Sequence, residues 1–288
     1  MSSDVTIIIP ARNEAQSLKT LLPSIRKHMP NAQLLVVDDG SDDDTAHVSR
    51  QHGAEVISHP YNKGNGASVK TGARAATSEL LVFMDADSQH NPADIPRLVA
   101  RLETGYDMVI GARSWSSQAN LMRGAANTIY NRLASLIVGH TIPDLTSGFR
   151  AARRRLFSRF LHMLPNGFSY PATSTMAFYR AGYSVAFEPI VAQQRSSATS
   201  HIRPLRDGLR FLLIIFRIGT LYSPLKLFVP VSTGFFLLGI GHYAFTYATQ
   251  GRFTNMSALL FITSVVVFLI GLVSEQITNL LYRDQENI

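Results

Sequence analysis

Cysteine is absent from this 288-residue chain, which excludes disulfides and thiolate metal sites and fits a cytoplasmic catalytic part. Charged residues are scarce: they make up 16% of the chain, whereas hydrophobic residues make up 46%. This balance is too apolar for an ordinary soluble enzyme of this length and indicates membrane segments. Acidic residues are outnumbered by basic ones, 20 against 27, giving a net charge of +7. Such an excess is typical of contacts with nucleic acid, anionic lipid or phosphorylated substrates.

No signal peptide, internal repeat or low-complexity segment is expected. The first apolar run, Val5 to Ile9, is only as long as a strand and ends at Pro10.

Short apolar runs alternate with helical stretches up to about residue 112. The expected strands are VTIII, QLLVVD, AEVIS, ELLVFMD and DMVIG, with a last strand in AFEPIVAQQR. The expected helices include 14–28, 45–52 and 92–103. Strands that are apolar on both faces and alternate with helices predict an α/β fold with a mostly parallel sheet flanked by helices. Between Ala119 and Tyr183 we expect mainly helix.

Two long apolar segments follow near the C-terminus. Residues 227–248 and 258–278 are each long enough to cross about 30 Å of hydrocarbon. Each contains one titratable residue, His242 or Glu275, and we expect His242 to be tolerated within a helix interface. Only nine residues, Thr249 to Ser257, join the segments, so we predict a transmembrane hairpin.

The stretch from Leu205 to Tyr222 is apolar apart from a few charges, among them Arg206, Arg210 and Arg217. On a helix these arginines fall within about 40° of one another. One narrow basic stripe on an apolar helix favours a helix that lies in the membrane surface. The alternative is a core helix with one solvent-exposed edge.

Basic residues are concentrated on one side of the hairpin. Those that precede the first span are Arg195, Arg203, Arg206, Arg210, Arg217 and Lys226. The same stretch has one acid, Asp207, and the connecting loop has only Arg252. The positive-inside rule then places both termini and the whole α/β domain in the cytoplasm.

Polar residues gather where the expected strands end. Pro10, Arg12, Asn13 and Glu14 follow the first strand, Asp38 and Asp39 end or follow the second, and Asp85, Asp87 and Gln89 follow ELLVF. In parallel α/β sheets, ligands bind beyond these carboxyl ends. A single aspartate there is often only a helix cap, and we expect that of Asp44 or Ser41.

Asp85 and Asp87 differ from a lone cap because two carboxylates so close need a cation or a proton to coexist. Oxygen ligands favour Mg²⁺ or Mn²⁺, which also bridge phosphates. A bare D-x-D pattern is common by chance, but a second acidic strand end beside it predicts a metal–nucleotide site.

Six stretches occur in an order that resembles inverting family 2 glycosyltransferases of the GT-A fold. They are TIIIPARNE, VVDDGSDDDT, NKGNGASVKTG, FMDADSQHNP, GAR and DLTSGFRA. With the hairpin, the chain resembles polyprenyl-phosphate glycosyltransferases of the dolichol-phosphate mannose synthase type. The resemblance covers about residues 4–202 and implies an enzyme that moves one sugar from a nucleotide-diphosphate donor, UDP- or GDP-linked, to a polyprenyl phosphate.

The resemblance also implies roles for matching residues. Nucleotide-sugar binding falls to Pro10, Arg12, Glu14, Asp38, Asp39, Lys63, Gly66, Asp85, Arg195 and Ser200. Asp85, Asp87 and Gln89 would hold Mg²⁺ or Mn²⁺, and Asp85, Asp87 and Arg195 would be catalytic. Arg113, Arg123 and Ser147 would take the acceptor phosphate.

The segment QRSSATSHIR resembles a closing loop written R-x-x-G-x-S-K in relatives. Arg195 and Ser200 match it, whereas Ala198 replaces the glycine and His201 the lysine. These departures concern the loop's mobility and one phosphate contact, not the reaction class.

A phosphate acceptor needs no general base, because its second pKa is near 6 by analogy with phosphorylated side chains. Arginines rather than a carboxylate or histidine are then expected around it. Asp144 is the nearest rival for a base, or it orients one of the arginines, and His90 is expected to be packed or capping. Arg123 has a plain alternative as a solvated side chain, and Arg153, Arg154, Arg155 and Arg159 are expected on a wet or lipid-facing helix side.

The predicted organisation is a cytoplasmic GT-A domain over 1–202, an amphipathic helix over 203–224 and a membrane hairpin over 225–288. The expected partners are the nucleotide sugar, polyprenyl phosphate, the bilayer and further copies of this chain bound through the hairpin, with no nucleic acid. One alternative is a family 2 enzyme that extends a polysaccharide, but such enzymes usually carry Q-x-x-R-W, and the only tryptophan here is Trp115. A non-catalytic membrane scaffold of the same fold is the other.

Overall fold

A computed structural model describes residues 4–113, 121–167, 169–191, 216, 219–220 and 222–283, without the side chains of 121–127, 129, 133, 281 and 283. The chain divides into two compact units. One unit comprises residues 1–135 and 140–202, and the other comprises residues 136–139 and 203–288. The expected closing loop and most of the expected surface helix lie outside the described residues.

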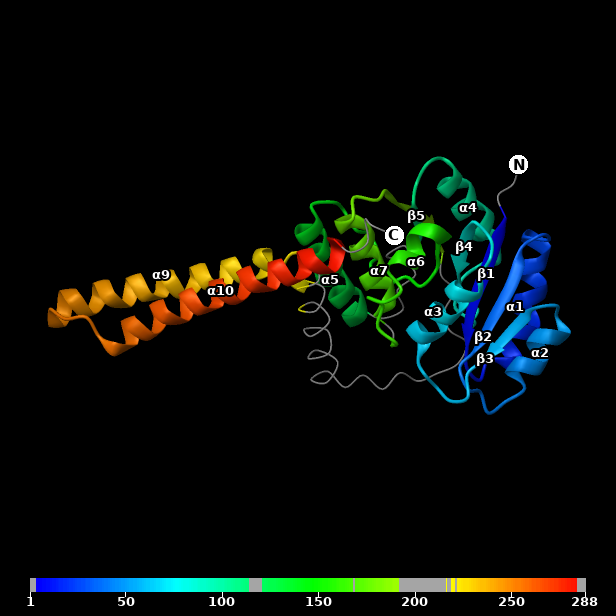
Figure 1. Cartoon of the computed structure of the whole chain (residues 1–288), viewed down its shortest axis with the longest axis horizontal. Helices are drawn as coiled ribbons and strands as arrows, with labels where there is room; N and C mark the ends of the chain where they lie inside the picture. The colour runs from blue at the N-terminus through cyan, green and yellow to red at the C-terminus, as the bar shows by residue number, and fades with distance from the viewer. Residues whose placement is uncertain are drawn as a thin grey trace. The chain divides into compact units, whose positions relative to one another are not determined.

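Within the described residues, one seven-stranded sheet is the frame of the first unit (Figure 1). Its strands are β1 (Val5–Ala11), β2 (Gln33–Asp38), β3 (Glu55–Ser58), β4 (Leu80–Phe83), β5 (Met108–Arg113), β6 (Arg150–Arg153) and β7 (Val185–Ile190). They lie in the order β3-β2-β1-β4-β6-β5-β7, and the pairs that exclude β6 are parallel. The predicted mostly parallel α/β sheet is therefore confirmed.

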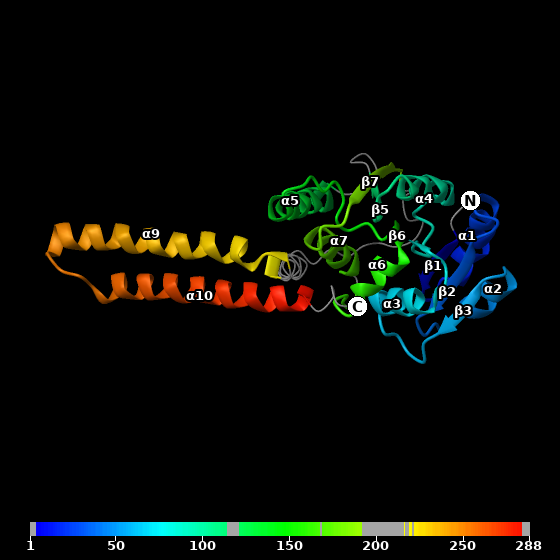
Figure 2. The ribbon, with the colours of Figure 1, turned by 45° about the horizontal axis from the view of Figure 1, so that its top comes forward.

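Helices cover both faces of this sheet (Figures 1 and 2). Within the described part of residues 4–191 the helices are α1 (Ala15–His28), α2 (Thr45–Gln51), α3 (Asn65–Ala75), α4 (Ile95–Glu103), α5 (Leu121–Val138), α6 (Arg154–Arg159) and α7 (Tyr170–Arg180), with a short 3-10 helix, η1, at Pro92–Asp94, and of these α5 lies apart from the strands. The apolar stripes of α1 and α4 pack with alternate residues of β1, β2 and β4 into one core. On the other face Gly72 of α3 packs against Ile8, and Phe157 of α6 packs against Phe83.

Strand β6 was not predicted. It runs antiparallel between β4 and β5, with Phe83 opposite Arg150, inside the stretch expected to be mainly helix. Its four residues, RAAR, lack the β-branched and aromatic residues that mark a strand. Because β6 is antiparallel, its beginning lies at the same sheet edge as the ends of β4 and β5. The segment before it, residues 144–149, is thus delivered to that edge.

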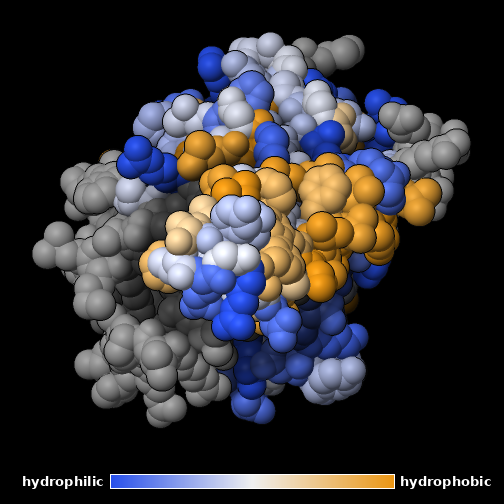
Figure 3. Space-filling model, turned by 90° about the vertical axis from the view of Figure 1, so that its left-hand side faces the viewer, coloured by the Kyte–Doolittle hydropathy of each residue, from blue (hydrophilic) through white to orange (hydrophobic). Residues whose placement is uncertain are grey.

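The second unit contains two long antiparallel helices, α9 (Pro224–Gln250) and α10 (Asn255–Arg283). Each is long and apolar enough to cross a membrane, with mean hydropathies of 1.5 and 2.6 in their most apolar parts. The helix α9 ends where Gly251 adopts a left-handed conformation, with φ of 65°. Apolar side chains cover the outside of the hairpin (Figure 3). The predicted hairpin is confirmed in its two helices.

Polar residues of the hairpin are paired across its two helices. Ser232 Oγ donates to the carbonyl of Ser264, and Ser264 Oγ donates to that of Ser232, both at 2.9 Å. His242 Nδ1 lies 3.0 Å from Ser257 Oγ, so this histidine does sit in the helix interface. These contacts satisfy groups that would otherwise be costly in hydrocarbon.

The carboxylate of Glu275 accepts the backbone N–H of Leu225 at 3.3 Å. Leu225 lies in the first turn of α9, where backbone N–H groups have no partner inside the helix. An acid within an apolar segment is thereby explained as a cap supplied by the neighbouring helix.

Candidate functional site

The ends of β1, β2 and β4 lie in register, since Ala11 is opposite Asp38 and Ile8 is opposite Phe83. The segments that follow these strands therefore meet at one sheet edge, and together with the segment from β3 into α3 they enclose a pocket of about 580 Å³. It is lined by Pro10, Ala11, Arg12, Glu14, Asp39, Asn62, Gly64, Asn65, Ser68, Asp85, Ala86, Asp87 and Gln89. The expectation that the polar strand ends converge is thus met.

The loops after β1 and β2 are held together by Asp43. Its carboxylate accepts the N–H of Ala15, the first residue of α1, at 3.1 Å and that of Thr45, the first residue of α2, at 3.0 Å. Burial raises its pKa, but these bonds and the Thr45 hydroxyl outweigh that effect and lower the pKa below its ordinary value. The prediction that Asp44 or Ser41 caps a helix is wrong. Asp44 makes no cap bond, and Ser41 Oγ instead accepts the N–H of Asn13.

Asp39 fastens the segment that follows β3. One carboxylate oxygen lies 2.7 Å from His59 Nδ1 and accepts the N–H of Lys63, and the other accepts the N–H of Gly64. His59 Nε2 lies 2.9 Å from Thr71 Oγ1 of α3. Burial raises the pKa of Asp39, and the bonds from His59, Lys63 and Gly64 more than reverse this, leaving the pKa below its ordinary value. Asp39 lines the pocket while both of its oxygens hold the loop.

Gly66 permits a close backbone contact. A Cβ on this residue would collide with the carbonyl oxygen of Pro165, and one on Gly64 would collide with that of Asn166. The N–H of Ala67 donates to that same Asn166 carbonyl at 3.1 Å. Gly66 is buried and does not line the pocket, so its glycine is explained by packing. Lys63 is exposed beside the pocket, with Nζ 5.7 Å from the ring centre of Tyr61.

Asp85, Asp87 and Gln89 all line the pocket. Ser88 has a φ of 58°, and this left-handed turn lets both Asp87 and Gln89 line it. Asp38 is buried beside the pocket rather than lining it, and its Oδ1 accepts the N–H of Ser41 at 3.0 Å.

The donor set fits a hard divalent cation. In the described part of the chain no three His, Asp or Glu side chains are placed to hold a metal ion by themselves. Two carboxylates and the Gln89 amide leave room for phosphates and water, which is how Mg²⁺ usually binds. Asn65, beside Asp85, also has a buried Oδ1 without a partner among the described residues.

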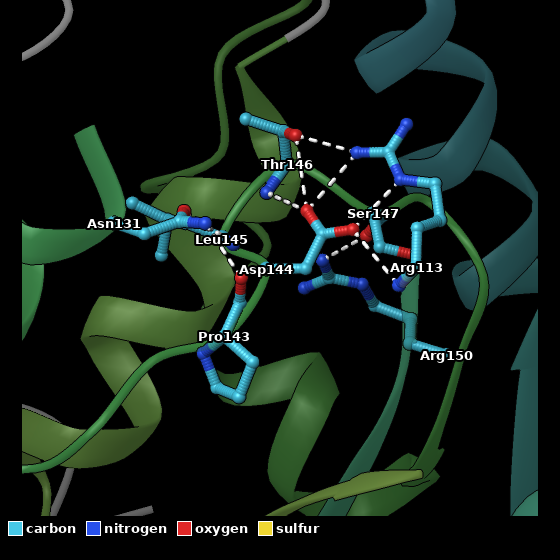
Figure 4. Close-up of polar contacts among 8 residues, drawn as sticks. All are labelled: Arg113, Asn131, Pro143, Asp144, Leu145, Thr146, Ser147 and Arg150. Carbon is cyan, nitrogen blue, oxygen red and sulfur yellow. Dashed lines mark hydrogen bonds and ion pairs between the residues drawn. The ribbon is translucent and has the colours of Figure 1, made fainter. Parts of the chain in front are cut away.

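A second cluster surrounds Arg113 at the end of β5 (Figure 4). Arg113 Nε donates to Asp144 at 2.7 Å, and one terminal nitrogen donates to Asp144 at 3.0 Å and to Thr146 Oγ1 at 2.7 Å. Burial raises the pKa of Asp144, but the bonds and charge of Arg113 outweigh this and lower it below its ordinary value. Asp144 therefore orients an arginine, as one of the two sequence readings held.

The segment that carries Asp144 is anchored from α5 as well. Asn131 Nδ2 donates to the carbonyl of Pro143 at 2.6 Å, and Asn131 Oδ1 accepts the N–H of Leu145 at 3.1 Å (Figure 4). The N–H of Ile142 donates to Ser135 Oγ at 2.9 Å. Hydrogen bonds from separate elements thus define the path of residues 142–147.

The two clusters adjoin each other. A Cβ on Gly148 would lie 2.7 Å from Asp85 Oδ2, so the backbone after Ser147 touches the carboxylate in the pocket. The charges of Asp85 and Asp87 also favour the protonated form of Arg113, although burial opposes it and the largest favourable effect comes from Asp144. Ser147 is buried, and its Oγ has no hydrogen-bond partner in the described part of the chain.

His90 is packed, as expected. It is 5% exposed, and its ring stacks on Phe149 with centroids 5.0 Å apart. Burial lowers the pKa of His90 to about 4, so the ring is neutral at pH 7.

Some predicted residues fall elsewhere. Arg195, Ser200 and the side chain of Arg123 lie outside the described residues. Arg153 lies on β6 rather than a helix, and Nε of Arg154 donates to the carbonyl of Ser78 at 2.8 Å.

The sequence analysis did not single out His59, Asn131 or Arg150. Each of these residues hydrogen-bonds to a residue or segment of the site, namely Asp39, residues 143–145 and Ser147. Arg150 is part of the DLTSGFRA motif, but nothing in the neighbouring residues predicted that it would be buried.

Solved structures resemble this fold. Glucosyl-3-phosphoglycerate synthase from Mycobacterium tuberculosis, in complex with Mn²⁺, UDP and glucosyl-3-phosphoglycerate, has a TM-score of 0.60 at 23% identity, covering 76% of this chain and 79% of that one. The same enzyme with Mn²⁺ and UDP-glucose scores 0.60 at 22% identity, with 76% and 78% covered. A mycobacterial protein described without a function scores 0.60 at 23% identity, with 76% and 74% covered.

Two family models match the sequence. Residues 223–280 match the GtrB C-terminal hairpin, which corresponds to α9 and most of α10. Residues 6–161 match glycosyl transferase family 2, and this stretch runs from β1 through α6 and includes the pocket and the Arg113 cluster. Because that match spans more than half of the chain, the protein belongs to glycosyl transferase family 2 and is a glycosyltransferase.

Proposed function

We propose that this glycosyltransferase moves one sugar from a nucleotide-diphosphate sugar to a polyprenyl phosphate at the cytoplasmic face of a membrane. The observation that carries the proposal is the contact between the two clusters at one sheet edge. An acidic pocket suited to a cation and a diphosphate adjoins a cluster with a buried serine hydroxyl and an arginine, which suit a phosphate monoester. The match to the GtrB hairpin supports a lipid acceptor.

Pro10, Arg12 and Glu14 would bind the nucleoside and diphosphate of the donor, with Asp38 and Asp39 shaping the wall of the pocket. Lys63 and Gly66 would act near the donor. Gly66 would do so indirectly, because its missing side chain lets the backbone of residues 165–167 pack against the start of α3. Asp85, Asp87 and Gln89 would hold Mg²⁺ or Mn²⁺, and Mn²⁺ with UDP is what the glucosyl-3-phosphoglycerate synthase structures contain. A divalent ion held there would neutralise negative charge on the leaving diphosphate. Arg195 and Ser200 would close over the same phosphates.

In the reaction, an acceptor phosphate oxygen forms a bond to the anomeric carbon of the sugar while the bond from that carbon to the diphosphate breaks. The electron pair leaves with the nucleoside diphosphate, and the configuration at the carbon inverts. The acceptor is already largely a dianion at neutral pH, so no residue has to remove a proton. Arg113, Arg123 and Ser147 would position that anion.

The hairpin would hold the enzyme at its lipid substrate. Six basic residues precede the first span and one lies in the connecting loop, which supports cytoplasmic termini and a cytoplasmic catalytic unit. The proposal retains the domain limits of 1–202, 203–224 and 225–288 and self-association through the hairpin.

The test is a transfer assay. Membranes containing the full chain are incubated with a panel of labelled UDP- and GDP-sugars and undecaprenyl phosphate, with Mg²⁺, with Mn²⁺ and with EDTA. We expect one labelled sugar to enter a lipid product in a metal-dependent manner.

Each competing function gives a distinct outcome in this assay. Label that enters only a polymer would favour a polysaccharide-extending enzyme. Neither transfer nor donor hydrolysis with any sugar would favour a non-catalytic scaffold, and full activity in EDTA would refute the metal assignment.

A further inference from the structure

Arg150, the first residue of β6, is completely buried. Removing a charged guanidinium from water is expensive, and well-packed apolar residues of similar size often replace buried charges without loss of stability. The charge here therefore needs an explanation beyond folding.

The hydrogen-bond partners of Arg150 are neutral groups, namely four oxygen atoms and the sulfur of Met108 at 4.0 Å. One terminal nitrogen donates to the Pro171 carbonyl at 2.9 Å, to Ser174 Oγ at 2.7 Å and to Thr175 Oγ1 at 3.2 Å. The other donates to the carbonyl of Ser147. Among the described residues no carboxylate bonds to it, and Nε has no partner. Burial lowers the pKa of Arg150 to about 10, so the group stays charged at pH 7.

These bonds join two parts of the chain. Ser147 belongs to the segment before β6, whereas Pro171, Ser174 and Thr175 lie in the first turns of α7. Tyr170 adds to the connection, since its hydroxyl donates to the Gly148 carbonyl at 3.3 Å and its ring centre lies 5.8 Å from the guanidinium carbon of Arg150. Arg150 and Tyr170 thus connect residues 147–148 to the start of α7.

The same segment faces the two ligand clusters. Ser147 stands between Arg113 and Arg150 (Figure 4), and its Oγ is buried without a partner in the described residues. Gly148 touches the Asp85 carboxylate. A shift of this backbone by a few tenths of an ångström would move both the hydroxyl and the support of Asp85.

We propose that Arg150 is a positioning residue that fixes Ser147 for the acceptor phosphate without touching either substrate. The proposal rests on the phosphate acceptor put forward above. In this proposal the role of the buried charge is to fix the geometry of the proposed acceptor site, not to stabilise the fold.

Two variants test it from opposite ends. Arg150→Lys keeps the charge but cannot reach all four oxygens. The double variant Ser174→Ala/Thr175→Val keeps Arg150 and removes two of its acceptors on α7. Arg159→Lys is the matched control, because Arg159 donates to the Tyr183 hydroxyl at 3.1 Å away from both clusters.

In each variant we expect the KM for polyprenyl phosphate to rise about tenfold or more, while donor affinity measured by calorimetry stays within about twofold. Hydrogen exchange measured by mass spectrometry should speed up about tenfold at the amides of residues 145–149. The control should change none of these values.

Unchanged exchange at 145–149 in both test variants would overturn the proposal whatever the substrate is. Faster exchange with an unchanged acceptor KM would also overturn it, because Arg150 would then be merely structural. A wild-type protein that never uses a prenyl phosphate would refute the acceptor assignment instead, and exchange would still decide whether Arg150 holds the segment.

Discussion

The two halves of the site are built in different ways. The pocket half follows β3, β2, β1 and β4, which are parallel neighbours, and the segments after these strands supply its residues. The arginine half joins the end of β5 to a segment that reaches the edge only because β6 runs antiparallel. Local order along the chain is enough for the first half, whereas the second requires contacts among β5, α5, β6 and α7.

The halves also differ in charge. Carboxylates outnumber cations around the pocket, where Glu14, Asp39, Asp85 and Asp87 face Arg12. Around Ser147 the balance is reversed, since the guanidinium groups of Arg113 and Arg150 lie there and the carboxylate of Asp144 bonds only to Arg113. An acidic half suits a cation, and a basic half suits an anion. Substitutions in the pocket half should therefore change metal dependence, and those in the arginine half should change use of the acceptor.

The largest effect is expected in the pocket half. Asp87→Asn should lower the transfer rate on the order of 10²-fold or more, because a charge interaction of a few kcal/mol on the leaving group is lost. The measurement is initial rate against Mn²⁺ concentration. Asp94→Asn serves as control, since Asp94 pairs with the exposed Arg97. Equal rates in the two variants would contradict the metal assignment.

A smaller effect is expected in the arginine half. Asp144→Asn should lower kcat/KM for the lipid acceptor about 10- to 30-fold and leave donor affinity intact, because Arg113 loses its orientation. If donor affinity falls as much as acceptor use, the division into two halves is wrong.

The same variant has a pH signature. The folded-state pKa of Asp144 is lowered, so its stabilising effect is present above the unfolded value of about 3.9 and is lost as pH falls through the folded value. Asp144→Asn should therefore cost about 2–4 kcal/mol of unfolding free energy at pH 7 and progressively less below about pH 4. Denaturant unfolding at a series of pH values would show this, and a pH-independent difference would contradict it.

Gly66→Ala probes the backbone contact behind the pocket. The added methyl group would collide with Pro165, so we expect a loss of about 1–3 kcal/mol and a donor KM raised several-fold. The control is Gly167→Ala in the facing segment, where a Cβ would meet nothing within 4 Å. Similar thermal unfolding of the two variants would show that the contact is not tight.

The smallest effect is expected for His90→Phe, which keeps the stack on Phe149 and removes both ring nitrogens. Transfer should stay within about threefold of wild type between pH 6 and 8, because no proton has to be taken from the acceptor. A loss as large as that of Asp87→Asn would identify His90 as a base and refute the proposed mechanism.

Much of this protein could be predicted from its sequence alone. Apolar runs such as Val5 to Ile9, the helix-length stretches between them and the two apolar segments near the C-terminus are local patterns, and each recurs in the structure as the expected element. Asp85, Asp87 and Gln89 could be grouped with Arg12 and Glu14 because the ends of parallel strands meet at one edge of a sheet.

Tertiary structure alone decided the rest. Strand β6 is made of arginines and alanines, so it has no apolar signature, and it exists because β4 and β5 pair with it. Asp43 rather than Asp44 caps two helices, and Gly66 contacts a backbone 100 residues away along the chain. The burial of Arg150 depends on oxygens from α7 and the 144–149 segment. Such non-local contacts leave no periodic pattern in the amino-acid order, and here they determine where the arginine half of the site lies.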